Sequence, residues 1–145
     1  MSERDPHNLQ RFVLAQNEDY ECALRELQQG QKKSHWIWYI FPQVAGLGHS
    51  PAAQEYAIRS RDEAVAYLAH AVLGARLQRC CEALLKHQGK RIQDIMGFPD
   101  DLKLRSSMTL FAMLSTQDSI FHKVLDCFYS GHTDDRTLAF LDAKL

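Results

Sequence analysis

Apolar side chains recur every three or four residues along most of the chain, which is the spacing of one face of an α-helix. The first such run follows Asp5-Pro6, an N-cap and first-turn pair, and stops at Gly30 after a polar interruption at residues 17–19. Another run begins at Val72, repeats at three and four residues as far as Leu85, and ends at Gly89. These runs predict helices that are separated by short polar connections.

Sequence signals also mark where further helices begin. Ser50-Pro51 places a capping hydroxyl before a first helical proline, and residues 60–63 form a capping box, Ser-Arg-Asp-Glu. Residues 99–101 open a helix over residues 102–114 whose second half is apolar nearly all round, as is typical of a central helix. Further N-caps are predicted at Asp118 and Asp134.

The stretch from Ser34 to Gln43 carries two Trp, one Tyr and one Phe in a single short apolar run. As a strand, it would bury both of its faces. As a helix, it would take Ser34 as its N-cap and end at Pro42. A strand needs partner strands, and the sequence offers no second convincing one, so we predict a helix.

These segments predict an all-α protein, with about seven or eight short helices packed into a single compact domain over residues 1–145. A chain of 145 residues fits one domain, and a domain of that size buries about 68–70% of the surface that its unfolded chain exposes. With 46% hydrophobic and 24% charged residues, the composition is that of a folded globular protein rather than a disordered chain.

The charge balance and the N-terminus exclude several classes of partner. The net charge of −1 provides no field that would attract nucleic acid or an anionic membrane surface, so we expect neither as a partner. No apolar run approaches the roughly 20 residues that span a bilayer. The first residues lack the apolar core of a signal peptide, so a cytoplasmic location is expected. The sequence specifies no oligomeric state.

Cysteine and histidine spacings predict no metal site and no cofactor. The four cysteines, Cys22, Cys80, Cys81 and Cys127, include no C-x-x-C pair, and we interpret them as reduced thiols in the core. The seven histidines show neither H-x-x-x-H nor H-E-x-x-H, the spacings that place two zinc ligands on one helix face. Carboxylates are scattered rather than paired, which leaves the question of enzymatic activity open.

Longer motifs give the chain a resemblance to a known family. They are Leu9-Gln10-Arg11-Phe12, Lys33-Ser34-His35-Trp36 with Phe41-Pro42-Gln43, Gly46-Leu47-Gly48, Ala66-Tyr67-Leu68, Leu73-Gly74, Arg76-Leu77, Asp101 with Lys103-Leu104, and Ser106-Ser107-Met108-Thr109-Leu110-Phe111. Through these motifs, over nearly its whole length, the chain resembles an uncharacterised, mainly bacterial family catalogued as domain of unknown function 1810. The resemblance implies a single all-α domain and no particular reaction.

The chain departs from this family at two positions. Ile37 stands where methionine is common, and Ala71 stands where proline is common after His70. Some members carry the label calpastatin. Calpastatins are largely disordered protease inhibitors, whereas this composition is that of a folding core, so we set the label aside.

Two clusters of polar residues interrupt otherwise apolar segments. The first lies along the aromatic stretch, from just before its start to its end, and consists of Lys33, Ser34, His35, Trp38 and Gln43. The second lies on the predicted central helix and consists of Lys103, Ser106, Ser107 and Thr109. An unpaired polar group in a core costs about 1–3 kcal/mol, so such residues need partners. Their ammonium, hydroxyl, imidazole and indole groups suit a phosphate-bearing or nucleotide-derived small molecule.

We therefore hypothesise a ligand pocket between the aromatic helix and the central helix. Lys103 would supply charge, and Trp38 would supply a stacking surface. His35 would act as the catalytic acid or base near neutral pH, with His49 as a second possibility. The loop of residues 46–50 would add backbone donors. The expected binding residues are Lys33, Ser34, Trp38, Gln43, Lys103, Ser106, Ser107 and Thr109.

Purely structural roles stand beside these functional ones. The hydroxyls at residues 106–109 would bond back to the preceding turn, Ser34 would cap a helix, and the two tryptophans would fill the core. The alternative function is a non-catalytic protein–protein interaction module whose aromatic segment partly surfaces. A ligand site predicts a concave cleft between the two helices, whereas an interaction module predicts a flat, exposed apolar patch.

Overall fold

Helices account for the regular structure that the computed structural model shows in residues 5–143, apart from one isolated parallel bridge between Val44 and Ile58. They are α1 (Gln10–Gln29), α2 (Ile37–Ile40), α3 (Pro51–Glu55), α4 (Arg61–Ala69), α5 (Ala71–Leu85), α6 (Ile92–Met96), α7 (Asp100–Ala112), α8 (Ile120–Tyr129) and α9 (Asp135–Ala143). The all-α prediction is confirmed. The nine helices of the described residues are slightly more than the expected seven or eight, and three of them, α2, α3 and α6, are single turns of four or five residues.

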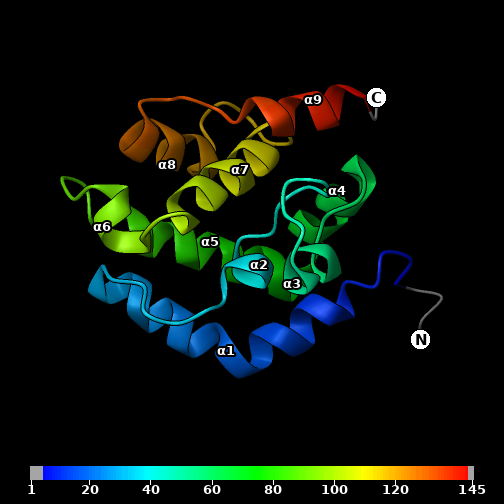
Figure 1. Cartoon of the computed structure of the whole chain (residues 1–145), viewed down its shortest axis with the longest axis horizontal. Coiled ribbons are helices and arrows are strands. Elements are labelled where there is room, and N and C mark those ends of the chain that lie inside the picture. Colours follow the sequence, from blue (N-terminus) through cyan, green and yellow to red (C-terminus); the bar gives the residue numbers. More distant parts are fainter. Residues whose placement is uncertain (1–4, 144–145) are drawn as a thin grey trace.

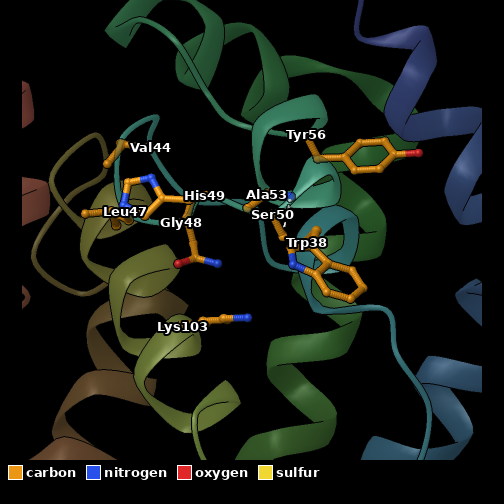
Figure 2. A pocket seen from close by; sticks show the side chains of 10 residues that line it. Trp38, Val44, Leu47, Gly48, His49, Ser50, Ala53, Tyr56 and Lys103 are labelled. Atoms are coloured by element: carbon orange, nitrogen blue, oxygen red, sulfur yellow. Dashed lines mark hydrogen bonds between the residues drawn. The ribbon is translucent and has the colours of Figure 1, made fainter.

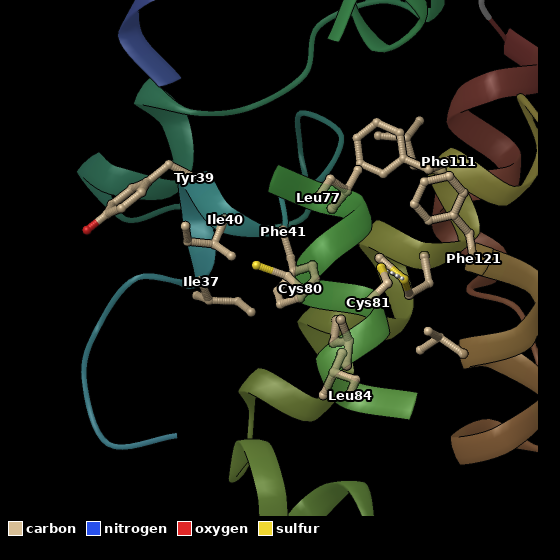
Figure 3. Close-up of a cluster of buried hydrophobic side chains, with 14 of the residues drawn as sticks. Ile37, Tyr39, Ile40, Phe41, Leu77, Cys80, Cys81, Leu84, Phe111 and Phe121 are labelled. Atoms are coloured by element: carbon tan, nitrogen blue, oxygen red, sulfur yellow. Dashed lines mark hydrogen bonds between the residues drawn. The ribbon is translucent and has the colours of Figure 1, made fainter. Parts of the chain in front are cut away.

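Helix α5 forms the middle of the molecule, between α1 on one side and α8 on the other (Figure 1). Farther from α1, α7 packs against both α8 and α9. Figure 3 shows Ile37 and Ile40 on one side of α5 and Phe111 and Phe121 on the other. Helix α5 serves both sides because its buried face is broad, and that face consists of Leu73, Leu77, Cys80, Cys81, Ala83 and Leu84.

Two of the four cysteines belong to this core. Cys80 and Cys81 are at most 1% exposed, and burial raises the pKa of Cys80 to about 12 because the thiolate would lose its hydration there. Cys127 is instead exposed on α8. The interpretation of all four cysteines as core thiols therefore holds for Cys80 and Cys81, whereas Cys22 is only partly buried and the interpretation is wrong for Cys127.

Helix α1 is one helix of 20 residues, so the predicted interruption at residues 17–19 is wrong. Gln16 and Tyr20 continue the buried face past this point. The Gln16 amide is satisfied there, because Nε2 donates to the Tyr39 carbonyl at 2.7 Å and to the Tyr67 hydroxyl at 3.0 Å. A polar run therefore does not break a helix when a buried amide keeps the helical spacing.

Both ends of α1 are capped by neighbouring segments. The helix begins at Gln10 rather than at Pro6, and the Asp5 carboxylate accepts a hydrogen bond from the Gln10 amide at 3.0 Å. At the other end Gly30 takes the expected left-handed conformation with φ +78°. Lys90 Nζ donates to the Gly30 carbonyl at 3.0 Å, which places a cation at the negative end of the helix dipole.

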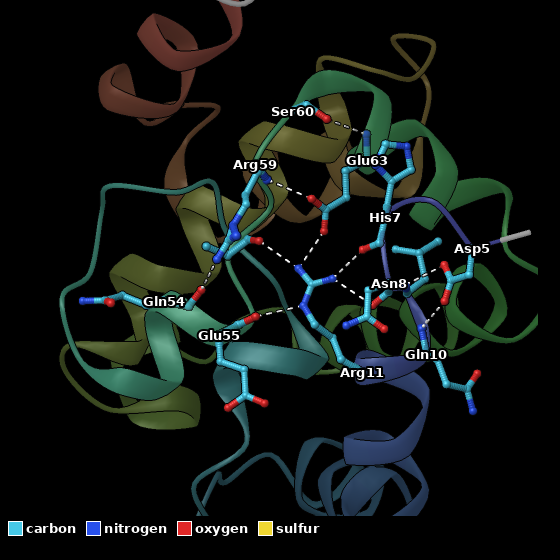
Figure 4. A network of polar contacts seen from close by, with 12 residues as sticks. Asp5, His7, Asn8, Gln10, Arg11, Gln54, Glu55, Arg59, Ser60 and Glu63 are labelled. Atoms are coloured by element: carbon cyan, nitrogen blue, oxygen red, sulfur yellow. Dashed lines mark hydrogen bonds and ion pairs between the residues drawn. The ribbon is translucent and has the colours of Figure 1, made fainter. Parts of the chain in front are cut away.

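Arg11 connects the first turn of α1 to the loop before α4 (Figure 4). Its Nε donates to the Glu55 carbonyl at 2.8 Å, and its Nη1 donates to the His7 carbonyl at 2.8 Å. Its Nη2 donates to the Ala57 carbonyl at 2.9 Å and pairs with the Glu63 carboxylate at 2.7 Å. This network holds four separate segments together in a largely buried position.

Polar N-caps begin five of the helices in the described residues, namely α3, α4, α5, α8 and α9. Ser50 and Ser60 each accept a hydrogen bond from the amide three residues on, at 3.1 and 3.0 Å, so both of these predicted starts are confirmed. Asp134 Oδ2 accepts from the Thr137 amide at 3.2 Å at the start of α9. Helix α8 takes Ser119 as its cap, so the prediction of Asp118 is off by one residue.

The aromatic stretch is helical for one turn only, which is α2, and an irregular connection at residues 31–36 precedes it. Trp36 occupies the N-cap position, so the prediction of Ser34 as the cap is wrong. No helix in the described part of the chain is long and apolar enough to cross a membrane.

Candidate functional site

A pocket of about 220 Å³ lies between α2, α3, α7 and the loop of residues 43–50, which we call the pocket loop (Figure 2). It is concave, and its position between the aromatic segment and α7 is the one that the ligand hypothesis requires. The lining residues are Trp38, Gln43, Val44, Leu47, Gly48, His49, Ser50, Ala53, Tyr56 and Lys103. This first pocket is the candidate functional site.

The pocket loop is fixed at its base and at its tip. The parallel bridge places the Ala45 amide 2.9 Å from the Ile58 carbonyl and the Ile58 amide 2.8 Å from the Gln43 carbonyl. From α9, Arg136 Nη2 donates to the Gly46 carbonyl at 3.0 Å. A Cβ on Gly48 would lie only 2.8 Å from the Ala53 side chain, so the loop needs glycine there to approach α3.

Lys103 brings a weakly paired cation to this pocket. Its Nζ lies 5.5 Å from the centre of the Trp38 ring and 3.8 Å from Asp100 Oδ1, and its side chain is 31% exposed. Asp100 makes its short contact elsewhere, because its Oδ2 lies 2.6 Å from Lys32 Nζ. Lys103 therefore retains most of its capacity to attract another anion.

The remaining polar groups of the pocket include an unsatisfied donor. The Trp38 indole N–H is buried and has no hydrogen-bond partner within the described residues. Figure 2 shows the nitrogen-bearing edge of this indole turned toward Ser50, while the Tyr56 hydroxyl points away from the other lining residues. The Ser50 hydroxyl accepts from the Ala53 amide, which occupies one lone pair of its oxygen and leaves its O–H able to donate. An unpaired buried donor costs about 1–3 kcal/mol, which an acceptor on a ligand would recover.

A second pocket of about 300 Å³ adjoins the first one. Gln43, Leu47 and Lys103 line both, so the two pockets meet at these residues. The other residues of the second pocket are Pro99, Leu102, Arg105, Ser106, Asp134 and Arg136.

The structure brings together three of the predicted site residues and separates the rest. Trp38, Gln43 and Lys103 line the first pocket, and Ser106 lines the second. His35 is exposed at the start of the aromatic segment and lines neither of these pockets. His49, the second possibility for proton transfer, is the imidazole that does line the first pocket.

Lys33 and Ser34 belong to a cluster around Glu26 on α1 instead. Glu26 Oε1 accepts hydrogen bonds from the Lys33 amide, the Ser34 amide and the Trp36 indole at 2.8, 3.0 and 3.0 Å, and Oε2 accepts from the Ser34 hydroxyl at 2.6 Å. Burial alone would raise the pKa of Glu26, but these hydrogen bonds outweigh it and lower the pKa to about 2. The cluster fixes residues 31–36 against α1 and so positions α2.

The hydroxyls of α7 have structural partners or none. Ser106 Oγ donates to Asp134 Oδ2 at 3.0 Å, and Thr109 Oγ1 accepts from the Asp134 amide at 2.9 Å while it donates to the Arg105 carbonyl at 2.8 Å. Ser107 is completely buried, and its hydroxyl has no partner within residues 5–143. These contacts hold the start of α9 against α7, as the structural explanation of the hydroxyls anticipated in part.

Sequence reasoning missed the arginines near the pockets. Arg136 lies on α9 and bonds to Gly46, 90 positions away in the sequence. Arg105 lines the second pocket from α7, next to the predicted Ser106. No local pattern in the sequence predicts that α9 contacts the pocket loop. Arg105, in contrast, is three residues after Leu102, and this spacing places both side chains on one helix face.

A family model and a solved structure both match nearly the whole chain. A family model described as protein of unknown function (DUF1810) matches residues 6–141 of the chain. Among solved structures, the chain is similar to the crystal structure of the conserved hypothetical protein Rv1873 from Mycobacterium tuberculosis, with 47% identity and a TM-score of 0.92 over 94% of this chain and 98% of that one. No curated protein matches the chain. The likeness extends along nearly the whole chain, and neither description states a ligand or a reaction.

Proposed function

The chain belongs to the family described as protein of unknown function DUF1810, and we propose that it binds a small phosphate-bearing ligand in the first pocket, with Lys103 as the cation that holds the phosphate. The observation that carries this proposal is the composition of the lining. Lys103 and the Trp38 indole supply donors, and Gln43 and His49 add polar side chains, while none of the described residues brings a carboxylate to the lining.

An anion is the ligand class that such a lining favours. A pocket with surplus donors and no acidic group attracts negative charge, and phosphate accepts several hydrogen bonds at once. Lys103 is held weakly by Asp100, so a phosphate would not have to displace a strong ion pair. The unpartnered indole N–H of Trp38 would gain an acceptor in the same event.

The size of the first pocket limits the ligand. Its volume of about 220 Å³ lies below the range of about 300–1,000 Å³ that is typical of small-molecule pockets. A phosphate with a small organic group fits this volume better than a large cofactor does. A bulkier phosphate ester would have to extend into the second pocket.

The alternative, an interaction module, receives less support. It requires the aromatic segment at the surface, but Trp36 and Ile37 are 1% exposed and Phe41 is 0% exposed. These side chains belong to the core, so they form no flat apolar patch for a protein partner.

The experiment is a binding comparison between phosphorylated compounds and their unphosphorylated parents. Ribose 5-phosphate and ribose are a suitable pair, measured by thermal shift and by calorimetric titration. We expect only the phosphorylated member to raise the melting temperature, because a ligand that binds the native state alone stabilises it. Lys103→Gln is expected to weaken binding about tenfold or more, whereas Lys33→Gln, which changes an exposed lysine outside the pocket, is expected to bind as the wild type does.

Two results would overturn the proposal. One is equal affinity of the wild type and a folded Lys103→Gln variant for the same phosphate ester. The other is the absence of any phosphate-dependent shift across sugar phosphates and nucleoside monophosphates.

A further inference from the structure

The second pocket differs from the first in its charge. It is lined by three cationic side chains, Lys103, Arg105 and Arg136, and by one carboxylate, that of Asp134. The Asp134 carboxylate is already engaged, because its Oδ2 accepts hydrogen bonds from Ser106 Oγ at 3.0 Å and from Thr137 Oγ1 at 2.5 Å. The second pocket therefore has a surplus of positive charge beside the first.

Arg105 and Arg136 have hydrogen-bond donors that are not used by ion pairs. Within the described residues neither Arg105 nor Arg136 forms a salt bridge, and Arg105 Nε is buried without a hydrogen-bond partner. Arg136 donates one Nη2 hydrogen bond to the Gly46 carbonyl, which uses part of its five-donor fork. Guanidinium groups with free donors match the geometry of phosphate oxygens better than an ammonium does.

Lys103 stands where the two pockets meet, since it lines both of them. A phosphate beside Lys103 in the first pocket would thus have the arginine-lined pocket next to it. The first pocket is smaller than a typical small-molecule site, and the second brings the combined groove into the usual range of about 300–1,000 Å³. One ligand that occupies both pockets fits this arrangement.

We infer that the ligand carries two phosphate groups, one held by Lys103 in the first pocket and the other held by Arg105 and Arg136 in the second. This inference rests on the proposed function and names its ligand class: a diphosphate or a bisphosphate, not a monophosphate. The Gly46 contact of Arg136 adds a physical connection, because the same side chain that contacts the second phosphate also fixes the pocket loop of the first.

Matched pairs of compounds that differ by one phosphate test the inference. Adenosine monophosphate and adenosine diphosphate form one pair, in which the second phosphate is joined directly to the first. Fructose 6-phosphate and fructose 1,6-bisphosphate form the other, in which the second phosphate is on a different carbon of the sugar. Dissociation constants are measured by calorimetry without divalent cations, so that the protein alone neutralises the charge. We expect the second phosphate to tighten binding about tenfold or more in at least one pair, and the responding pair identifies the phosphate spacing.

The variants separate this subsite from general attraction of charge. Arg105 lines the second pocket but not the first, so in Arg105→Gln the advantage of the second phosphate is expected to disappear while the affinity for the monophosphate stays within about twofold of the wild type. Arg136→Gln is also expected to remove the advantage, and it should weaken monophosphate binding as well because it releases the Gly46 carbonyl of the pocket loop. Arg79→Gln, which removes an exposed charge from α5 outside both pockets, is expected to keep the advantage.

The possible outcomes distinguish the two proposals. If monophosphates bind through Lys103 but neither pair shows an advantage, the inference is wrong and the proposed function stands. If Arg136→Gln weakens both members of a pair equally, Arg136 acts only by fixing Gly46, and the inference is again overturned. If no member of either pair binds, the proposed function is wrong, and the inference that rests on it is wrong as well.

Discussion

The polar groups around Arg11 and those around Lys103 are in opposite states. Every guanidinium nitrogen of Arg11 donates to a carbonyl or to the Glu63 carboxylate, and the distances lie between 2.7 and 2.9 Å. Lys103 has its nearest carboxylate at 3.8 Å, and the indole N–H of neighbouring Trp38 has no partner within the described residues. The first region is saturated with acceptors, and the second lacks them.

This difference is more informative than the size of the cavities. The pocket beside Arg11 has about 500 Å³, more than twice the volume of the first pocket, yet two of its lining residues are Glu55 and Glu63. Its largely buried cation is already paired, so an anionic ligand would have to displace a buried ion pair. Buried polar groups with partners indicate structure, whereas donors without acceptors in a concave site indicate a ligand.

The strongest test of the comparison is to remove the cation from each region. Arg11→Met leaves the 4%-exposed Glu63 carboxylate without its guanidinium, so we expect a loss of about 3–5 kcal/mol in the free energy of unfolding. Lys103→Met removes a weakly paired and partly exposed cation, and we expect a loss of less than about 1 kcal/mol. Urea unfolding of both variants measures the two values, and similar losses would contradict the distinction.

Glu26 is a second polar group whose hydrogen bonds are all satisfied, and the pH dependence of protein stability provides a test of its role. Its pKa is lowered to about 2 in the folded protein against about 4.5 normally, so the unfolded chain takes up this proton first as the pH falls. The stabilisation is complete above pH 4.5 and is lost as the pH falls toward 2, by about 3 kcal/mol in total. Denaturant unfolding between pH 6 and 3 measures it, and Glu26→Gln is the control that should remove this part of the pH dependence. A wild type and variant with parallel pH profiles would disprove the assignment.

The two tryptophans allow the same comparison with one side-chain type. The Trp36 indole N–H donates to Glu26 at 3.0 Å, whereas that of Trp38 has no partner within residues 5–143. We expect Trp36→Phe to cost about 1.5–3 kcal/mol more than Trp38→Phe, because only the first substitution breaks a hydrogen bond to a charged group. Thermal and urea unfolding provide the measurement.

A double-mutant cycle removes the effect of indole volume from that result. In a Glu26→Gln background, the cost of Trp36→Phe should fall, since the charged acceptor is gone, while the cost of Trp38→Phe should not change. An unchanged cost for Trp36→Phe would show that packing alone produces the difference.

The sequence predicted the helices better than the contacts between them. Helical spacing and capping residues are local signals, so α3, α4, α5 and α7 begin within two residues of their predicted starts. Ser34 was assigned to a local cap because that is its usual role, but its hydroxyl bonds to Glu26, on the preceding helix. A partner on another helix leaves no periodic signal in the chain.

The candidate pocket was predictable in part for the same reason. Trp38 and Gln43 lie in one motif and Lys103 in another, and each is a polar group beside apolar neighbours, which is a local signal. Arg136 has no such signal, because its role depends on how α9 packs near the pocket loop. His35 has the right chemistry in the right motif, but the turn before α2 leaves it exposed and outside both pockets.

The smallest expected effect comes from two adjacent serines of α7. Ser106→Ala removes a donor to the Asp134 carboxylate that caps α9, and we expect a loss of about 1 kcal/mol in the free energy of unfolding. Ser107→Ala removes a buried hydroxyl that has no partner in the described structure, so we expect no loss, or a gain of less than about 1 kcal/mol. Urea unfolding with repeated measurements resolves this difference. If Ser107→Ala proved the more destabilising, the Ser107 hydroxyl would have a structural partner in solution, and the expectation would be wrong.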